Sequence, residues 1–392
     1  MGRPLLNRRL DGLGTTIFAE MSALAAKTGA INLGQGFPDT DGPDEIREIA
    51  VAALRDTGAH LNQYPPGPGL PDLRLAIAEH RRRFHGMHYD PDTEVLVTTG
   101  ATEAIAAAVL ALVEPGDEVV ALEPYYDSYA ACIAMAGGVR VGVPLRPPYF
   151  RLDRDALRAA ITPRTRLLIL NTPHNPTGTV LTRDELASVA ELAVEHDLVV
   201  VTDEVYEHLV FDGEHVPLAS LPGMRERTVT ISSAGKTFSF TGWKIGWVCA
   251  TPELVAAVRT TKQFLTYVSG GPFQPAVARA LRLPDAYFTA FRDGMREKRD
   301  VLVAGLEAAG LTVYRPQGTY FVTTDITPLG FDDGLDFCRR LPELCGVVAV
   351  PEMVFFDDTP EARKIGRPLV RFAFCKREDV LAEAAKRLAT LR

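Results

Sequence analysis

The sequence predicts an α/β fold, with a mostly parallel sheet in its first two thirds and a smaller α+β domain after it. Three observations support this prediction. A chain of 392 residues is too long to fold around one small hydrophobic core, so two domains are expected. Short apolar runs alternate with helical segments through the middle of the chain, and this alternation stops near Pro284. Near-continuous apolar strands separated by helices are typical of a parallel sheet that is covered on both faces.

The alternation runs from about residue 94 to residue 204. The expected strands are EVLVT (94–98), EVVALE (118–123), VRVGVPL (139–145), TRLLILN (165–171) and DLVVVTDE (197–204). The expected helices cover residues 102–113, about 127–136 and 182–196. Thr182 with Glu185 three residues later forms a capping box, which indicates where the last of these helices begins.

The pattern changes after Pro284. A long helical stretch (285–309) leads into the short strands TYFVTTD (319–325) and PLVRFAF (368–374), and a helix follows them. This arrangement indicates a separate α+β unit. We therefore predict a large domain at 45–284 and a small domain at 285–392, to which an N-terminal segment (1–44) contributes.

Composition excludes several classes of function. The net charge of -8 disfavours a general binder of nucleic-acid phosphates. No apolar run approaches the roughly 20 residues that cross a bilayer, and MGRPLLNRRLDGLG lacks the apolar centre of an export signal. We therefore expect a cytoplasmic protein with neither a nucleic-acid nor a membrane partner. The five cysteines contain no C-x-x-C pair, so buried, reduced thiols are expected.

The histidines show no metal-binding spacing, and no metal is predicted. His80, His85 and His88 lie among arginines at the end of an expected helix. The run RRR (81–83) is interpreted as a solvated basic face.

Ligand chemistry is expected where the strands end, because open α/β sheets present the carboxyl ends of their strands to the ligand. TTGATEA (98–104) turns at Gly100 into a helix whose free N–H groups favour an anion. The loop NTPHNPTG (171–178) offers the amide of Asn175, although a plain Asx turn explains this loop about as well.

The strand that ends at Asp203 carries a carboxylate into a partly desolvated position. An unpaired carboxylate is costly there, so a cationic partner is implied. Tyr206 lies three residues further on, within reach of the same space.

The segment ISSAGKTFSFTGWKIGW (231–247) holds Lys236 and Lys244 among hydroxyl and glycine residues, without an acidic neighbour. Such a segment suits a phosphate, and a desolvated lysine becomes a nucleophile toward an aldehyde. One ligand matches all of these groups, with its ring nitrogen at Asp203 and its aldehyde at Lys236. That ligand is pyridoxal 5'-phosphate, an electron sink while a carboxylate keeps its nitrogen protonated.

The motifs NTPHNPTG, DEVYEHLVF, SSAGKTFSFTGWKIGW and VRFAF resemble, in order and spacing, the class I aminotransferases of fold type I. INLGQGFPD (31–39) and NQYPPGPG (62–69) extend the likeness over nearly the whole chain. It is greatest to the subgroup of kynurenine and glutamine transaminases, and within it to actinobacterial N-succinyldiaminopimelate aminotransferases of lysine biosynthesis. The resemblance implies a seven-stranded sheet, a homodimer, and ping-pong transfer of an amino group from an amino acid to a 2-oxo acid such as 2-oxoglutarate.

The resemblance also assigns roles to residues of this chain. The Schiff-base lysine falls on Lys236, the pyridinium partner on Asp203, and the ligands of the phenolate oxygen on Asn175 and Tyr206. The expected phosphate ligands are Ala101, Thr102, Ser233, Lys244 and, from the neighbouring subunit, Tyr64. The expected stacking ring is Tyr126, or Tyr125 if the turn is shifted by one residue. The substrate carboxylate is expected at Arg371, Asn175 and the backbone of Gly36.

Two positions depart from the family pattern. Phe18 stands where relatives with aromatic substrates often carry a tryptophan, and Val268, after Tyr267, stands where some place a histidine. Phe18 and Tyr267 are therefore expected to contact the substrate side chain, although a role as simple core aromatics explains them, and Phe355, equally well. The amino donor stays open among succinylated diaminopimelate, kynurenine, glutamine, methionine and aromatic amino acids. A cysteine-S-conjugate β-lyase, which shares the first chemical step, is the alternative.

Two functions from other classes are disfavoured. A ligand-sensing regulator built on this fold would need a helix-turn-helix segment or a basic arm, and neither is found. A dinucleotide-dependent oxidoreductase would need G-x-G-x-x-G after a strand, whereas GLG (12–14) and GQG (34–36) are too short.

Overall fold

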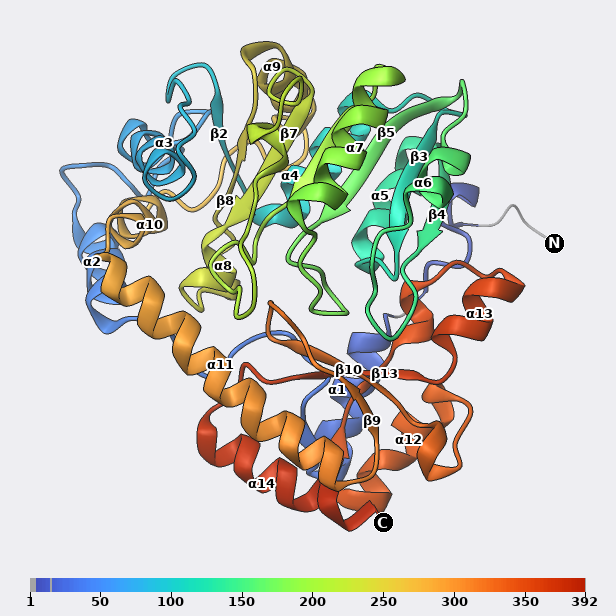
Figure 1. The fold of residues 1–392 in the computed structure, drawn as a ribbon. Helices are drawn as coiled ribbons and strands as arrows, with labels where there is room; N and C mark the ends of the chain where they lie inside the picture. Colours follow the sequence, from blue (N-terminus) through green and yellow to red (C-terminus); the bar gives the residue numbers. More distant parts are fainter. Residues whose placement is uncertain (1–4, 15, 392) are drawn as a thin grey trace.

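A seven-stranded sheet forms the centre of the computed structural model, which describes residues 5–14 and 16–391 (Figure 1). In spatial order the strands are β2 (Val95–Thr98), β8 (Gly246–Cys249), β7 (Thr228–Ser233), β6 (Val199–Asp203), β5 (Thr165–Asn171), β3 (Glu118–Glu123) and β4 (Val139–Pro144). Only β8 runs antiparallel to its neighbours. The predicted α/β class and mostly parallel sheet are thus confirmed.

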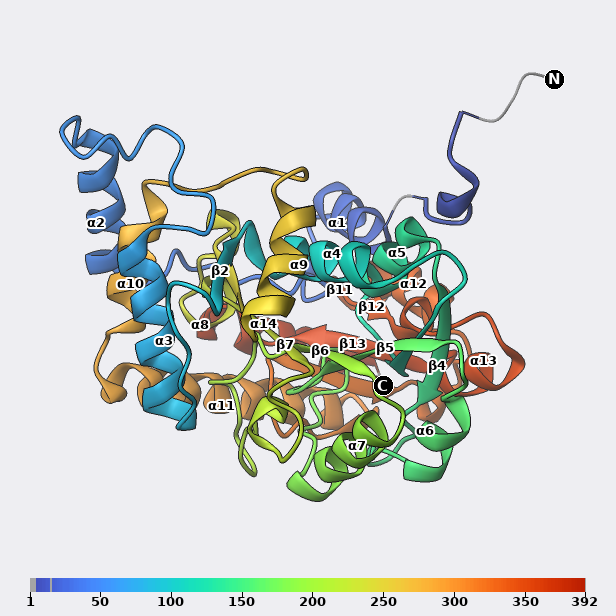
Figure 2. The ribbon, with the colours of Figure 1, turned by 90° about the horizontal axis from the view of Figure 1, so that it is seen from above.

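Helices cover both faces of this sheet, as the view from above shows (Figure 2). One face carries α4 (Gly100–Leu112), α5 (Asp127–Ala136) and α9 (Pro252–Lys262), and the other carries α6 (Arg154–Ala160) and α7 (Arg183–Glu195). The strands are buried on both sides, which explains their near-continuous apolar sequences. Helix α7 begins with the predicted capping box of Thr182 and Glu185.

A second group of helices packs beside β2 at one edge of the sheet. It consists of α2 (Asp44–Arg55), α3 (Pro71–His85) and α10 (Phe273–Leu281). The short helix α8 (Ala234–Thr237) follows β7. The short 3-10 helices are η1 (Arg8–Leu10), η2 (Leu218–Ser220), η3 (Thr241–Trp243), η4 (Thr327–Leu329), η5 (Glu352–Phe355) and η6 (Ala389–Leu391).

A four-stranded antiparallel sheet lies below the large one in Figure 1. Its order is β12 (Val350–Pro351), β13 (Leu369–Ala373), β10 (Phe321–Asp325) and β9 (Thr312–Tyr314). Around it lie α1 (Ile17–Thr28), α11 (Asp285–Ala308), α12 (Gly334–Cys345), α13 (Pro360–Gly366) and α14 (Glu378–Leu388). Strand β1 (Ile31–Asn32) pairs in parallel with β11 (Val347–Val348), so the N-terminal segment packs with the C-terminal third. The domain boundaries at 44 and 284 stay a prediction.

The basic run at the end of α3 is not the solvated face that the sequence suggested. Arg82 and Arg83 are exposed, but Arg81 is fully buried and His80 is also buried. Arg81 forms ion pairs with Glu204 and Glu207, which lie more than a hundred residues away in the sequence. The distant carboxylates stabilise a buried arginine that local sequence alone cannot distinguish from its exposed neighbours.

All five cysteines are unpaired, and all but the partly exposed Cys345 are buried, as expected. No helix in the described part of the chain is both long enough and apolar enough to cross a membrane.

Candidate active site

The carboxyl ends of β5, β6 and β7 meet at one edge of the large sheet, where a pocket of about 350 Å³ lies. The register sets Asn171 on β5 beside Asp203 on β6. The start of α4, the N-terminal segment and β13 of the small sheet complete the wall. The predicted site residues that line the pocket are Phe18, Gly36, Ala101, Thr102, Tyr126, Asn175, Asp203, Tyr206, Ser233, Lys236, Lys244 and Arg371.

One end of the pocket is built to hold an anion. Helix α4 begins there at Gly100, whose φ of 72° suits a glycine. A Cβ atom on Gly100 would lie 3.3 Å from Nζ of Lys244, so this ammonium group sits over the start of the helix. A Cβ atom on Gly246 would lie only 2.5 Å from the carbonyl carbon of Gly100, which shows how closely the Lys244 segment approaches α4. The helix N-terminus and the lysine together favour a phosphate.

Lys236 lies in α8, at the centre of the pocket wall. Its Nζ donates to the carbonyl oxygen of Gly36 at 3.4 Å and lies 5.8 Å from the ring centroid of Tyr206. Burial lowers the pKa of Lys236 to about 8; Asp203 opposes this shift, whereas the nearby cation Arg371 adds to it. An amine in this environment is readily deprotonated, which a nucleophile or a general base requires.

Asp203 is buried at the end of β6 and accepts two hydrogen bonds. The hydroxyl of Tyr129 donates to its Oδ2 at 2.7 Å, and the backbone N–H of Val205 donates to its Oδ1 at 3.3 Å. Burial raises the pKa of Asp203, while these two donors and Lys236 oppose the shift. Tyr129 was not among the residues predicted from the sequence. It lies three residues after Tyr126 on α5, so helical spacing could have placed both on one face.

Arg371 projects from β13 and joins the two halves of the molecule. Its Nη1 donates to Oδ1 of Asn175 at 2.9 Å, and its Nη2 donates to the carbonyl oxygen of Gly34 at 2.9 Å. The guanidinium carbon lies 4.0 Å from the ring centroid of Phe321, another pocket residue that the sequence analysis missed. The Arg371 side chain is buried, and burial lowers its pKa. A buried guanidinium that lines a pocket is suited to bind a carboxylate.

The structure separates the two tyrosines of EPYYD. Tyr126 lines the pocket and packs edge-on against Tyr129, with ring centroids 5.8 Å apart. Tyr125 points elsewhere, because its hydroxyl donates to Oδ1 of Asp357 at 2.7 Å. Between the two alternatives, Tyr126 is therefore the ring at the pocket.

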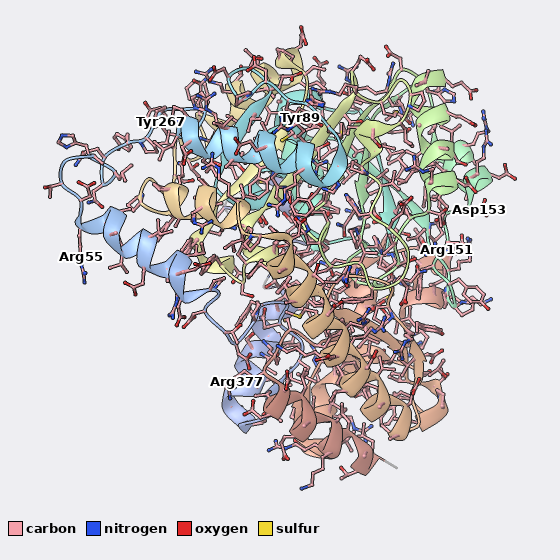
Figure 3. All side chains as sticks on the ribbon, turned by 60° about the vertical axis from the view of Figure 1, so that its left-hand side comes forward. Arg55, Tyr89, Arg151, Asp153, Tyr267 and Arg377 are labelled. Atoms are coloured by element: carbon pink, nitrogen blue, oxygen red, sulfur yellow. The ribbon has the colours of Figure 1, made fainter. Side chains whose placement is uncertain are left out.

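Tyr64 and Tyr267 are the two predicted site residues that do not line this pocket. Their side chains pack edge-on with ring centroids 5.4 Å apart, and they are 81% and 53% exposed. Figure 3 shows Tyr267 at the periphery of the molecule. The segment that carries Tyr267 is nevertheless close to the start of α4. The hydroxyl of Thr266, its neighbour, lies 2.9 Å from the hydroxyl of Thr99, which directly precedes α4.

The pocket thus provides an anion site, a buried amine and a buried carboxylate, which fits the phosphate, aldehyde and ring nitrogen of pyridoxal phosphate. The sequence model of aminotransferase classes I and II matches residues 28–388. The chain belongs to the class I and II aminotransferases. It is therefore a pyridoxal-phosphate-dependent aminotransferase of fold type I.

Several relatives of this aminotransferase are similar over almost their full length. A probable N-succinyldiaminopimelate aminotransferase of Mycobacterium tuberculosis is 58% identical over 390 residues, which cover 98% of each chain. The solved structure of the N-succinyldiaminopimelate aminotransferase from that organism superposes with a TM-score of 0.95, covering 99% of this chain and 100% of the other. The methionine aminotransferase of Escherichia coli is 43% identical over 384 residues, covering 98% and 97% of the two chains. Human kynurenine–oxoglutarate transaminase 1 is 38% identical over 426 residues, covering 99% and 98%.

Proposed function

We propose that this aminotransferase transfers the amino group of N-succinyl-L,L-diaminopimelate to 2-oxoglutarate, as a step of lysine biosynthesis. The observation that supports this substrate is the 58% identity to a probable N-succinyldiaminopimelate aminotransferase over nearly the whole of both chains. The methionine and kynurenine enzymes are less similar, at 43% and 38%.

In this proposal Arg371 binds the α-carboxylate of the substrate. The guanidinium is buried at the pocket wall, and among the described residues its hydrogen-bond partners are an amide oxygen and a backbone carbonyl oxygen rather than a carboxylate. Its contact with Oδ1 leaves the amide nitrogen of Asn175 free to donate to a ligand. A carboxylate held there places the substrate Cα beside Lys236.

Lys236 would hold the cofactor, and its free amine would accept a proton from the substrate Cα. Its pKa of about 8 leaves part of the amine neutral at pH 7, so it can accept this proton. Pyridoxal phosphate, when bound, supplies the electron sink that makes removal of this proton possible. Asp203 keeps the proton on the ring nitrogen, and its hydrogen bond from Tyr129 favours the ionised carboxylate.

The remaining predicted residues hold the cofactor in place. Ala101 and Thr102 at the start of α4 would hold its phosphate together with Ser233 and Lys244, which also line the pocket. Tyr206 would donate to its phenolate oxygen, and Tyr126 would stack on its ring. Phe18 would contact the substrate side chain, because its ring lies beside the guanidinium of Arg371, whose carbon is 5.3 Å from the ring centroid. The ring centroids of Phe18 and Phe355 are 5.9 Å apart.

We also propose a homodimer. Tyr64 and Tyr267 form an exposed aromatic surface with Phe264 and Leu265, which are 82% and 44% exposed. Exposed apolar surface of this kind is typical of an interface, and a two-fold axis would let each chain cover the other. Tyr64 would then reach the phosphate of the neighbouring subunit, and Tyr267 its substrate.

A donor panel tests the substrate. The purified enzyme, loaded with pyridoxal phosphate, is mixed separately with N-succinyl-L,L-diaminopimelate, methionine, kynurenine and glutamine, and conversion of the cofactor is followed by absorbance. We expect the highest kcat/KM for the succinylated donor, by at least roughly tenfold, which corresponds to about 1.4 kcal/mol of transition-state binding. Faster conversion by methionine or kynurenine would reject the substrate and leave the family intact.

Two further measurements test the chemistry. Borohydride reduction followed by mass spectrometry locates the covalently attached cofactor, and Lys236→Ala is expected to abolish the attachment. Pyruvate and ammonia released from a cysteine S-conjugate, in preference to a transaminated product, would favour the β-lyase alternative.

A further inference from the structure

Glu352 is a fully buried carboxyl group with one oxygen unpaired. It opens η5, directly after β12, and its side chain lies in the interior of the C-terminal half. Oε1 accepts a hydrogen bond from the hydroxyl of Thr323 at 2.5 Å. Oε2 is buried and has no hydrogen-bond partner among the described residues. A carboxylate so placed is costly unless a nearby positive charge stabilises it.

The sheet register places Arg371 next to this carboxyl group. Arg371 on β13 lies opposite Thr323 on β10 and opposite Val350 on β12. Directly opposed residues of antiparallel strands share a face of the sheet, so the Thr323 side chain lies beside the arginine stem. Thr323 on β10 donates to Glu352, which directly follows β12, and Arg371 lies on β13 between these two strands. The carboxyl group and the arginine are therefore positioned by the same part of the small sheet.

Arg371 also has one unpaired nitrogen. Its Nη1 and Nη2 are engaged by Asn175 and Gly34 at the pocket, whereas Nε is buried and has no partner among the described residues. Arg371 and Glu352 are not within 4.0 Å of one another, so they form no direct ion pair. The two charges nevertheless influence one another through the protein interior, because Arg371 lowers the pKa of Glu352 and Glu352 raises that of Arg371.

The other groups that face Glu352 do not supply a competing charge. Tyr314 on β9 is a neutral phenol at physiological pH, and its pKa is raised. The charged residues of α12 and α13, which also pack against η5, are exposed to solvent: Asp336, Arg339, Arg340, Glu343, Glu361, Arg363 and Lys364. Around Arg371, the phenols Tyr206 and Tyr320 are neutral, and Asp127 acts from α5. Arg371 is therefore the cation that stabilises an ionised Glu352.

Resting on the proposed role of Arg371 in carboxylate binding, we propose that Glu352 is the resident counter-ion of Arg371 and takes up a proton when a substrate carboxylate binds. In the empty pocket the guanidinium stabilises the Glu352 carboxylate. A bound substrate carboxylate neutralises the same guanidinium, and two buried anions would then share one cation. A proton transferred from solvent to Glu352 removes the second anion. The guanidinium of Arg371 then has one anionic partner before binding, the Glu352 carboxylate, and one after it, the substrate carboxylate.

The affinity for a substrate carboxylate is expected to depend on pH, because binding is coupled to the uptake of a proton by Glu352. Burial raises the pKa of Glu352 to about 7, while the hydrogen bond from Thr323 and the charge of Arg371 oppose the shift. Substrate binding weakens the influence of Arg371, so the pKa rises further. Below about pH 7 Glu352 is already neutral and binding needs no proton. Above that pH, binding takes up as much as one proton, and the affinity for a carboxylate falls by up to about tenfold per pH unit.

Calorimetric titration of the pyridoxal phosphate-loaded enzyme with glutarate tests the proposal, because glutarate has neither an amino nor an oxo group and cannot react. Titrations at pH 8 in two buffers of different ionisation enthalpy give the number of protons taken up. The wild type is expected to take up more protons than Glu352→Gln, by as much as one. The matched control is Glu123→Gln, which removes another buried carboxyl group whose pKa is raised by burial to about 7. Asp357 and Arg140, rather than Arg371, are the main charged groups acting on Glu123, so this variant is expected to behave as the wild type.

Infrared difference spectra provide a second readout, and its first part uses only the wild type and so does not depend on whether the variant folds. Glutarate is expected to produce the C=O band of a newly protonated carboxylic acid in the wild type at pH 8, and this band is expected to be absent from Glu352→Gln. Equal proton uptake by wild type and Glu352→Gln, or no new band in the wild type, overturns the proposal. If glutarate binds Arg371→Ala as tightly as the wild type, the proposed role of Arg371 in carboxylate binding is rejected as well. This result distinguishes a failure of that role from a failure of the Glu352 proposal alone.

Discussion

At the scale of single residues, the hydrogen bond from Tyr129 to Asp203 favours the ionised form of a buried carboxyl group. A hydrogen bond to a charged group contributes about 1.5–3 kcal/mol. The Tyr129→Phe substitution removes this donor, and the pKa of Asp203, already raised by burial, rises further. We expect kcat/KM to fall roughly 10- to 100-fold, measured with a saturating cofactor concentration.

Tyr125→Phe is the matched control for this prediction. Tyr125 is a neighbouring buried tyrosine, and its hydroxyl donates to Asp357 outside the pocket. An equal loss of kcat/KM in both variants would contradict a specific effect on Asp203.

Most of the pocket residues could be predicted from the sequence, because the neighbouring residues in the chain already indicate their roles. Asp203 ends an apolar strand, Asn175 lies in the loop that follows another, and Lys236 lies in a segment without acidic residues. Phe321 and Glu352 could not be found in this way, because they gain their significance from Arg371, and strand register brings these three residues together. No local pattern distinguishes a buried Glu352 from the exposed glutamates around it.

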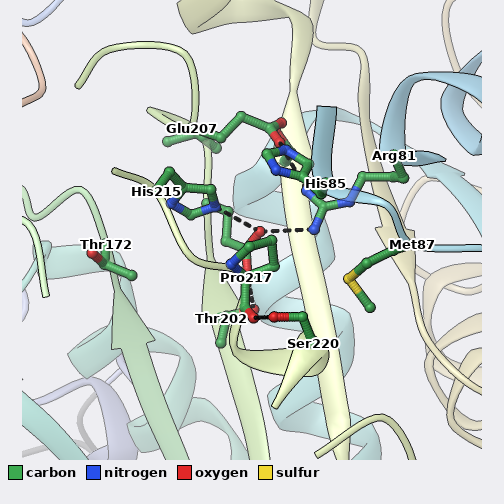
Figure 4. Close-up of polar contacts among 12 residues, drawn as sticks. Arg81, His85, Met87, Thr172, Thr202, Glu207, His215, Pro217 and Ser220 are labelled. Atoms are coloured by element: carbon green, nitrogen blue, oxygen red, sulfur yellow. Dashed lines mark hydrogen bonds and ion pairs between the residues drawn. The ribbon is translucent and has the colours of Figure 1, made fainter. Parts of the chain in front are cut away.

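At the scale of elements, Arg81 joins α3 to the segment that follows β6. Figure 4 shows Arg81, His85, Glu207 and His215 gathered around one point. Nη2 of Arg81 lies 3.0 Å from Glu204 and Nη1 lies 2.8 Å from Glu207, and all three side chains are buried. Burial would lower the pKa of Arg81, but the two carboxylates raise it.

This cluster is better described as an ion-pair network than as a metal site. Within the described residues, His80, Glu207 and His208 form one group with metal-ligand chemistry, and His85, Glu207 and His215 form another. Glu207 is shared by both groups, but its Oε2 already accepts from Arg81 and its Oε1 from Ser232. The sequence did not indicate this cluster, because its two halves lie in segments more than a hundred residues apart.

The network predicts a large loss of stability on removal of the arginine. Arg81→Met leaves two buried carboxylates without their cation, which typically costs about 3–5 kcal/mol. We expect a clearly lower midpoint in urea-induced unfolding. Arg82→Met, on the same helix and exposed, is expected to unfold near the wild-type midpoint. Similar midpoints for both variants would show that Arg81 contributes no more than a surface residue.

At the scale of the whole molecule, one exposed aromatic surface predicts the assembly. Phe264 is 82% exposed and belongs to the surface that includes Tyr64 and Tyr267. A charge at its centre would have to be desolvated on association, so Phe264→Glu is expected to weaken the proposed dimer. Sedimentation velocity over a range of concentrations is expected to show a shift toward monomer.

A surface tyrosine elsewhere serves as the control for the dimer prediction. Tyr149 is 75% exposed and lies in the chain two residues before Arg151, which Figure 3 shows on the side opposite Tyr267. Tyr149→Glu is expected to leave the sedimentation profile unchanged. A wild-type monomer at all concentrations would reject the dimer, and a shift in both variants would reject this interface.

Glu352 also links the stability of the whole molecule to pH. Its pKa is about 7 in the folded chain, against 4.5 as its ordinary value. A carboxyl whose pKa is raised by folding contributes stability that is fully present below its unfolded pKa and is lost as the pH rises through the folded pKa. Between about pH 4.5 and pH 7, Glu352 therefore lowers the free energy of unfolding by about 3 kcal/mol.

Replacing the carboxyl group by an amide removes this dependence, because glutamine has no proton to lose. Measured by thermal unfolding of the ligand-free enzyme, the decrease in Tm between pH 5 and pH 8 is expected to be smaller for Glu352→Gln than for the wild type. Glu343→Gln, exposed on α12, is expected to follow the wild type at both pH values. Parallel decreases in all three proteins would mean that folding does not raise the pKa of Glu352, because a group that binds the same number of protons in both states adds no pH dependence to the free energy of unfolding. In that case Glu352 would already be ionised at pH 5, and the pH dependence of substrate binding inferred from a folded pKa of about 7 would be wrong.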